Sequence, residues 1–116
     1  MTDRPLEADL AAWGKVITLR TTGRRSGLTR VTTIGFVEDA DGSLLVAASS
    51  ASTGWAANLR TDPRCLVERD AQARPYDATV LDEPGRAAAI TRLILKYGTP
   101  AERLGRGPAF RLEPAA

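Results

Sequence analysis

The chain has 116 residues, 43% of them hydrophobic, and a formal net charge of +2. This length supports one compact core and excludes a two-domain enzyme with a cleft between its domains. The sequence contains no histidine and a single cysteine, which excludes histidine-based catalytic triads and zinc sites built on histidine or several thiolates. Any enzyme chemistry must therefore come from a bound organic cofactor or from an acid or base other than histidine.

The cellular setting follows from the same counts. Cys65 cannot form an internal disulfide, which fits a reducing compartment, and its strand context predicts a buried, unreactive thiol. No apolar run approaches the ~18 residues of a membrane span, and the N-terminus lacks the basic-then-apolar order of a signal peptide. We therefore expect a cytoplasmic protein with no transmembrane segment and no metal site, folded as a single domain over residues 1–116.

The predicted elements are short strands joined by tight turns, together with three helices. Runs of β-branched and aliphatic residues indicate the strands, and an Asp-Gly pair within residues 39–42 indicates a hairpin turn. The C-terminal tail, residues 113–116, is predicted to be frayed. In chain order, the sequence predicts a helix over 5–13 within the N-terminal segment 1–14, strands over 15–22, 28–37 and 43–49, a short helix ending at Arg60, strands over 64–69 and 74–82, a helix over 84–97 and a last strand over 108–112.

This order of elements narrows the fold. It does not alternate strand and helix, so a Rossmann fold is not expected. Five or six strands with short hairpins and one long helix predict a mainly β (α+β) fold, a small antiparallel barrel or sandwich decorated by two or three helices.

The segment TTGRRSGLTR (21–30) is the most distinctive part of the chain. It is a turn between two predicted strands, with glycines that permit positive φ, two adjacent arginines, a serine hydroxyl and exposed backbone N–H groups. No acidic residue lies between Leu10 and Val37. Guanidinium forks and converging N–H groups can bind an anion, so the segment predicts an anion site; a solvated basic hairpin turn is the alternative.

Two stretches, VITLRTTGRRSGLTRVT (16–32) and LLVAASSASTGWAANLRTDPRCLVE (44–68), together resemble the deazaflavin-dependent nitroreductase family of actinobacteria. The resemblance extends over roughly residues 15–82. It implies a small split β-barrel of about six strands, like that of FMN-binding reductases. It also implies binding of coenzyme F420, an 8-hydroxy-5-deazaflavin whose tail carries a phosphate and several carboxylates.

The resemblance implies a role for each matching residue. The basic turn and the arginine that follows it would hold the phosphate and anionic tail. The end of the third strand and the start of the next loop would line the deazaflavin ring, with a tryptophan beside it, and Asn58 matches the helix asparagine of the family. Tyr97 would lie on the substrate side, where its phenol could act as a catalytic hydrogen-bond donor. The cofactor-binding residues implied in this way are Gly23, Arg24, Arg25, Ser26, Gly27, Arg30, Ala48, Ser49, Ser50, Trp55 and Asn58.

Some features depart from the family pattern and leave alternatives open. The loop over 50–54 is short, and few aromatic residues follow the long helix to wall a substrate pocket. Trp55 and Tyr97 could each be a core contact, because large aromatic side chains bury much apolar area. Gly35, in the second predicted strand, stands where the family usually has a larger residue, and marks either a bulge or a close approach.

The leading hypothesis is a deazaflavin-dependent oxidoreductase that transfers a hydride between reduced coenzyme F420 and a small quinone, enone or nitro compound. One alternative is a non-catalytic protein that binds deazaflavin or another anionic ligand, and another is an FMN-binding split-barrel reductase. Nucleic-acid binding is disfavoured, because the basic stretch lacks the stacking aromatic residues that single strands require. The resemblance leaves a homodimer open, since split barrels often dimerise with the site near the interface.

Overall fold

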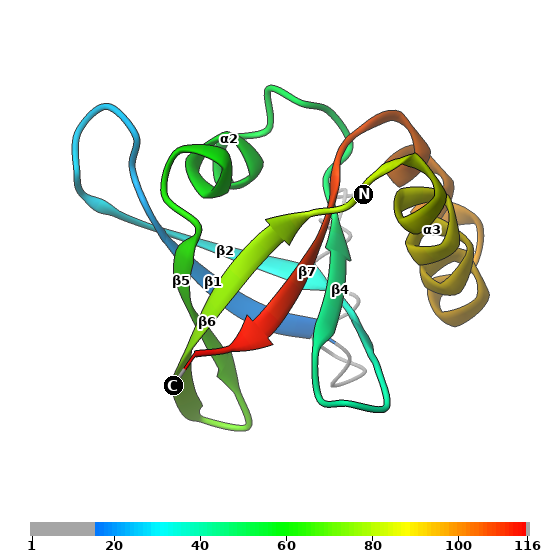
Figure 1. The fold of residues 1–116 in the computed structure, drawn as a ribbon, viewed down its shortest axis with the longest axis horizontal. Helices are drawn as coiled ribbons and strands as arrows, with labels where there is room; N and C mark the ends of the chain where they lie inside the picture. Colours follow the sequence, from blue (N-terminus) through cyan, green and yellow to red (C-terminus); the bar gives the residue numbers. More distant parts are fainter. Residues whose placement is uncertain (1–15, 116) are drawn as a thin grey trace, which may run out of the picture.

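The computed structural model describes residues 16–115, so the predicted N-terminal helix lies outside the described residues. The chain forms one curled antiparallel sheet with helices at its end and on its outside (Figure 1). The strands are β1 (Val16–Thr22), β2 (Thr29–Gly35), β3 (Val37–Glu38), β4 (Leu44–Ala47), β5 (Arg64–Arg69), β6 (Gln72–Val80) and β7 (Ala109–Pro114), and the helices are α2 (Gly54–Thr61), α3 (Glu83–Tyr97) and the 3-10 helix η1 (Thr99–Arg106).

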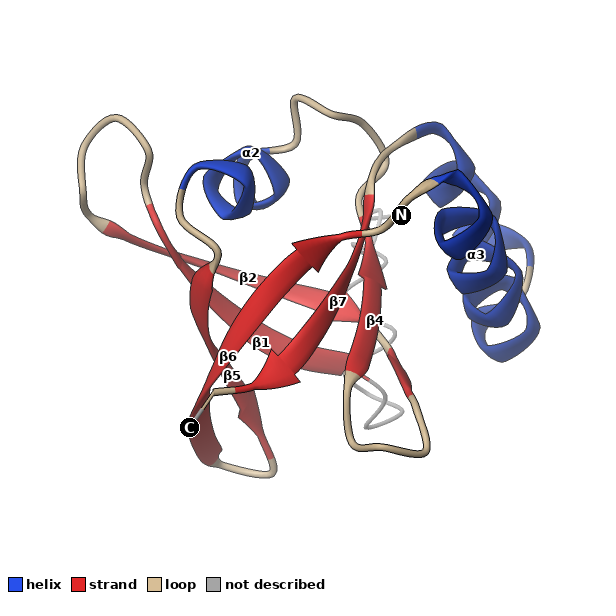
Figure 2. Cartoon of the chain, in the orientation of Figure 1, coloured by secondary structure: helices blue, strands red, loops and turns tan. Residues whose placement is uncertain are grey.

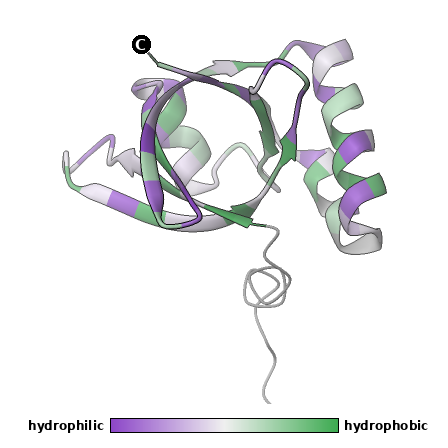
Figure 3. Ribbon diagram, turned by 90° about the horizontal axis from the view of Figure 1, so that it is seen from below, coloured by the Kyte–Doolittle hydropathy of each residue, from purple (hydrophilic) through white to green (hydrophobic). Residues whose placement is uncertain are grey.

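The strands lie in the order β2-β1-β5-β6-β7-β4-β3, and every neighbouring pair is antiparallel. Seen end-on, the sheet curls into a barrel (Figure 3). Its two edge strands, β2 and β3, follow each other directly in the chain, so Phe36 connects the two edges. The mainly β barrel confirms the predicted fold class, with seven strands where about six were expected.

The strand predicted over 28–37 is broken at Phe36, where β2 ends and β3 begins. The backbone N–H of Phe36 donates to the Tyr97 hydroxyl at 2.9 Å, and the hydroxyl donates to the Phe36 carbonyl at the same distance. The Tyr97 ring lies so close that a Cβ on Gly35 would be 3.0 Å from it. Gly35 therefore marks a close approach, one of its two predicted interpretations, and the Tyr97 hydroxyl bonds both backbone groups of Phe36 at the break.

Two apolar clusters stabilise the barrel. One fills its interior and includes Leu19, Val46 and Phe110, while the other lies between the sheet and α3 and includes Leu45 and Leu93. Strand β4 is buried along its whole length, because alternate side chains enter the two clusters. This double burial explains the uninterrupted apolar sequence of β4.

Both α-helices agree with the prediction to within one residue, α2 at its end and α3 at its start. The Asp82 carboxylate accepts from the Gly85 N–H at 3.0 Å and caps α3. Gly98, at a φ of 83°, ends the same helix. Helix α2 lies across the upper end of the barrel in Figure 2, with Trp55 and Leu59 in the interior cluster.

The C-terminal strand is longer than the sequence predicts. Strand β7 pairs with both β4 and β6 and continues to Pro114, and the Ala115 N–H donates to the Pro75 carbonyl at 3.0 Å. The prediction of a frayed tail is therefore wrong for residues 113–115, because they pair with β6 through backbone hydrogen bonds. None of the helices within residues 16–115 combines the length and apolar content that crossing a lipid bilayer requires.

Candidate anion-binding site

The basic turn, residues 23–27, joins β1 to β2 at the tip of a hairpin that extends beyond the barrel wall (Figure 1). The Gly23 N–H donates to the Leu28 carbonyl and the Gly27 N–H to the Gly23 carbonyl, both at 2.8 Å. Gly27 has a φ of +73°, which glycine adopts without strain. The Ser26 hydroxyl accepts from the Leu28 N–H at 3.1 Å. Internal bonds therefore fix the shape of the turn.

A cavity of about 300 Å³ lies between this turn, β2 and α2. It is open to solvent, and polar and charged side chains dominate its lining. Gly54, the first residue of α2, also lines the cavity, which the sequence did not predict. We call the cavity the basic pocket; its lining residues are Gly23, Arg24, Arg25, Ser26, Arg30, Gly54 and Asn58.

The three arginines of the basic pocket have no carboxylate partner within the described part of the chain. They come from two elements, with Arg24 and Arg25 in the turn and Arg30 at the second position of β2. Arg30 pairs in register with Thr21, whose side chain is buried at the end of β1. Three cationic groups without neighbouring acids create a positive potential that favours an anion.

The N-terminus of α2 adds to this potential. The first turn contains no acidic residue, and the side chain of the N-cap residue Thr53 does not cap the helix. The first N–H groups of an α-helix have no partner within the helix, and the helix dipole is positive there. Because Gly54 lines the basic pocket, this end of α2 faces the same cavity as the arginines.

Asn58 connects the turn to the barrel. Its side chain is 3% exposed, and its Oδ1 accepts from the backbone N–H of Arg24 at 3.2 Å and from Arg24 Nη1 at 3.0 Å. Its Nδ2 donates to Thr21 Oγ1 at 3.1 Å. One buried carboxamide thereby joins α2, the basic turn and β1.

The residues expected beside the cofactor ring lie outside the lining of the basic pocket. Ala48 is buried just after β4, and its N–H donates to the Pro108 carbonyl at 2.9 Å. Gly107 packs directly on this corner, because a Cβ there would collide with the Ala48 carbonyl and lie 2.6 Å from the Ser50 N. Ser49 is exposed and Ser50 is half-buried. Ala48, Ser49 and Ser50 are the first residues of the loop that leads to Gly54.

Trp55 and Gly27 also lie apart from the pocket lining. The Trp55 side chain is buried in the interior cluster, with its ring centroid 5.8 Å from that of Phe110. This position supports the core-anchor interpretation of Trp55. Its neighbour Gly54 reaches the pocket, so the anchor also fixes the start of α2.

Tyr97 lies far from the basic pocket. Its ring covers Gly35 at one end of β2, whereas Arg30 is near the other end, about 17 Å away along the strand. Burial raises the pKa of the phenol, and the hydrogen bond with Phe36 opposes that rise. The hydroxyl bonds both backbone groups of Phe36, so a catalytic role for Tyr97 stays a prediction.

Cys65 does not belong to the site. Its thiol is buried in the interior cluster, where desolvation and the charges of Asp77 and Asp62 raise its pKa to about 12. A thiol with that pKa is protonated at neutral pH and is a poor nucleophile.

Comparison with known proteins identifies the family. The sequence model of the F420H(2)-dependent quinone reductases matches residues 7–103, which is most of the chain. The chain belongs to the F420H(2)-dependent quinone reductase family. Membership confirms the resemblance seen in the sequence, the cofactor class, coenzyme F420, and the reaction class, oxidoreduction. No functionally curated protein matches the chain.

Solved structures show the same fold at low sequence identity. An F420-H2-dependent reductase, FDR-A, is 23% identical with a TM-score of 0.70, over 85% of this chain and 94% of that one. HutZ, the heme storage protein from Vibrio cholerae, is 19% identical with a TM-score of 0.71, over 97% and 92%. A conserved hypothetical protein from Mycobacterium tuberculosis is 20% identical with a TM-score of 0.64, over 100% and 82%. The shared barrel therefore serves proteins of different function.

Proposed function

We propose that the basic pocket holds the phosphate and carboxylate tail of coenzyme F420, and that the chain catalyses hydride transfer between the reduced coenzyme and a quinone. The observation that carries the proposal is the set of three arginines around one cavity with no described acid beside them. Enone and nitro acceptors remain further candidate substrates.

The donor set suits the tail. A phosphate presents several acceptor oxygens, and the guanidinium forks of Arg25 and Arg30 can each bond two of them. The end of α2 at Gly54 offers backbone N–H donors to the same anion. Without an anion, the guanidinium groups and the N–H donors would bond only water, whereas a multiply charged tail would accept hydrogen bonds from all of them.

The ring would extend from the tail toward the loop that precedes α2. Ala48, Ser49 and Ser50 begin this loop and Gly54 ends it in the pocket, so chain continuity supports the placement. The close packing of Gly107 on Ala48 holds the first part of the loop in place. The bound coenzyme supplies the hydride chemistry, and the chain binds and orients it.

A second candidate function is binding without turnover. Among the described residues, the pocket lining contains no carboxylate, phenol or thiol that could serve as an acid or base, and Tyr97 is engaged with Phe36 instead. This arrangement would suit a carrier of F420 or of another anionic ligand as well as a reductase. Turnover separates the two candidates.

The chain is also proposed to form a homodimer in a cytoplasmic setting. One fold neighbour, 23% identical with a TM-score of 0.71 over 85% of this chain and 80% of that one, is described as a domain-swapped dimer. Val31 and Leu66 are exposed and both pair in register with Arg20, so they lie in one row on the outside of the sheet. The free thiol of Cys65 suits a reducing compartment. Light scattering of the purified chain tests the dimer.

The test of the proposed function is a fluorescence titration of the protein with F420 and with FMN at low and high salt. We expect tight F420 binding that weakens as salt is added, because salt screens the attraction between the arginines and the anionic tail, and weaker binding of FMN, whose only anionic group is one phosphate. Oxidation of F420H2 is then followed with a soluble quinone. Absence of F420 binding overturns the proposal; binding without oxidation of F420H2 by quinone, enone or nitro compounds favours the carrier.

A further inference from the structure

We propose that Asn58 is a positioning residue, which sets the direction of the Arg24 guanidinium without neutralising its charge, and that it does not itself bind the cofactor. The inference rests on the proposed function of the basic pocket and explains how the pocket is organised before an anion arrives. It differs from the role that the family resemblance implies for Asn58, which is direct contact with the cofactor.

The hydrogen-bonding capacity of the Asn58 carboxamide is nearly used within the protein. A carboxamide oxygen has two lone pairs, and both Oδ1 bonds go to Arg24, one to its backbone N–H and one to Nη1. One Nδ2 hydrogen goes to Thr21 Oγ1. With its side chain 3% exposed, Asn58 has at most one N–H left for a ligand.

Thr21 anchors the amide from the side of the barrel. Its own side chain is buried and does not line the basic pocket, so its bond with Nδ2 lies beneath the site. If the amide rotated by half a turn, its NH2 group would face the N–H and guanidinium of Arg24 and both bonds would be lost. Arg24 offers only donors and so determines which end of Asn58 faces it, while the Thr21 hydroxyl, which can donate or accept, holds the amide in place from below.

The neutrality of Asn58 matters as much as its geometry. A carboxylate at this position would hold Arg24 equally well, but it would cancel the positive charge that an anion needs. A neutral oxygen restrains the long side chain of Arg24 without neutralising it, and this restraint lowers the conformational entropy lost on binding. The remaining guanidinium donors of Arg24 stay available to a ligand.

The test is a double-mutant cycle on F420 affinity with Asn58→Ala, Arg24→Ala and both together. If Asn58 acts through Arg24, we expect Asn58→Ala to weaken binding about 3- to 15-fold in the wild-type chain and to have little effect once Arg24 is absent. An equal loss in both backgrounds means direct contact of Asn58 with the cofactor and overturns the inference, while the proposed function stands. No binding by the wild-type chain overturns both.

Two further variants serve if Asn58→Ala does not fold. Thr21→Val keeps the shape of a buried strand residue and removes only the bond that anchors the amide, so we expect it to weaken F420 binding although Thr21 lines no part of the pocket. Asn58→Asp keeps an acceptor for Arg24 and adds a negative charge. We expect Asn58→Asp to bind F420 more weakly and with a smaller salt dependence, because the added carboxylate offsets about one positive charge of the pocket. Unchanged affinity and salt dependence in both variants contradicts the inference.

Discussion

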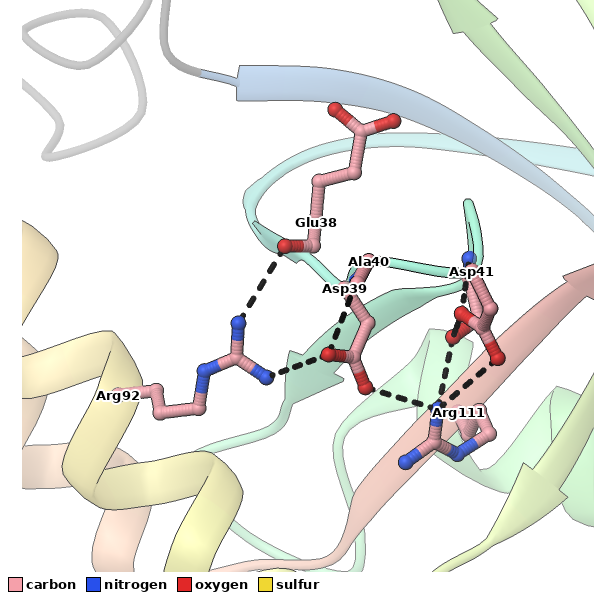
Figure 4. Close-up of polar contacts among 7 residues, drawn as sticks. Glu38, Asp39, Ala40, Asp41, Arg92 and Arg111 are labelled. Carbon is pink, nitrogen blue, oxygen red and sulfur yellow. Dashed lines mark hydrogen bonds and ion pairs between the residues drawn. The ribbon is translucent and has the colours of Figure 1, made fainter.

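Two groups of arginines in this barrel differ in one respect, the presence of an acid. At the turn between β3 and β4, Asp39 accepts from Arg92 at 3.2 Å and from Arg111 at 3.1 Å (Figure 4). Arg111 also donates to the Ser43 hydroxyl at 2.7 Å, with the Asp41 carboxylate 4.0 Å away. We call this group the paired cluster. Every cation in it faces an anion, so it fastens α3 and β7 to the turn.

The basic pocket holds its arginines differently. Arg24 is restrained by a neutral amide, and neither Arg25 nor Arg30 has an ion-pair partner within residues 16–115. Strand β4 begins just after the turn of the paired cluster, and the loop that follows β4 leads to Gly54 in the basic pocket. The paired cluster therefore precedes β4 in the chain, and the loop to the pocket follows it. The two groups therefore differ in the partners of their arginines and not in the type of cation.

Reversing one charge in the basic pocket should have the largest effect. We expect Arg25→Glu to weaken F420 binding by about 100-fold or more, because a carboxylate would repel the anionic tail and attract Arg24 and Arg30. Fluorescence titration measures the dissociation constant, and circular dichroism shows whether the variant folds.

Arg74→Glu is the matched control for this reversal. Arg74 is exposed on β6, and its Nη2 donates to Gln72 Oε1 at 3.3 Å. The net charge of the chain changes equally in both variants. If Arg74→Glu weakened F420 binding as strongly as Arg25→Glu, the effect would come from overall charge and the pocket assignment would be wrong.

Removing the phenol oxygen of Tyr97 should have the next largest effect, and it should act on stability. Tyr97→Phe loses both hydrogen bonds with the Phe36 backbone where β2 and β3 meet, so we expect the free energy of unfolding to fall by about 1–2 kcal/mol. Urea denaturation measures the loss. F420 affinity should be unchanged, since Tyr97 is remote from the pocket.

The same variant tests the catalytic prediction for Tyr97. A phenol that donates to the substrate would make the rate of quinone reduction fall at saturating F420H2, whereas a structural phenol would leave that rate unchanged at a temperature where the variant is folded. A large loss of rate without a loss of stability would place Tyr97 on the substrate side after all.

Much of the basic pocket could be predicted because it is local in sequence. Glycines, arginines and a serine within residues 23–30 fix both the turn and most of its lining. Gly54 could not be predicted in the same way, since only the packing of α2 on the barrel brings it to the turn. Asn58 was found by family resemblance, but its bonds to Thr21 and Arg24 span 37 and 34 residues.

The fold shows the same division. The strands, hairpin turns and helix starts follow from patterns within a few residues, and they were predicted to within about three residues at most ends. The break at Phe36 depends on a hydroxyl 61 residues away, and the continuation of β7 beyond Leu112 depends on pairing with β6. Periodicity carries no information about either contact, because both are made by tertiary packing.

Neutralising Asp39 should have the smallest effect, and it completes the contrast between the two groups. Hydrogen bonds from Arg111, from the Ala40 N–H and from Arg92 lower the pKa of Asp39 below its usual 3.8. A carboxyl group whose pKa is lowered by folding stabilises the folded state at pH values above its unfolded-state pKa. This contribution is lost as the pH falls through the folded-state pKa. Wild type should therefore be modestly more stable than Asp39→Asn at neutral pH.

The difference between the two proteins should shrink as the pH falls below 3.8, because the wild-type carboxylate then becomes protonated and neutral like the amide. Thermal unfolding at several pH values measures it, and the exposed setting of the cluster keeps it small. F420 affinity should not change, since the freed Arg92 and Arg111 lie at the other end of β4 from the pocket. A pH-independent difference would mean that Asp39 acts through packing, and a changed F420 affinity would mean that the two groups of arginines are coupled.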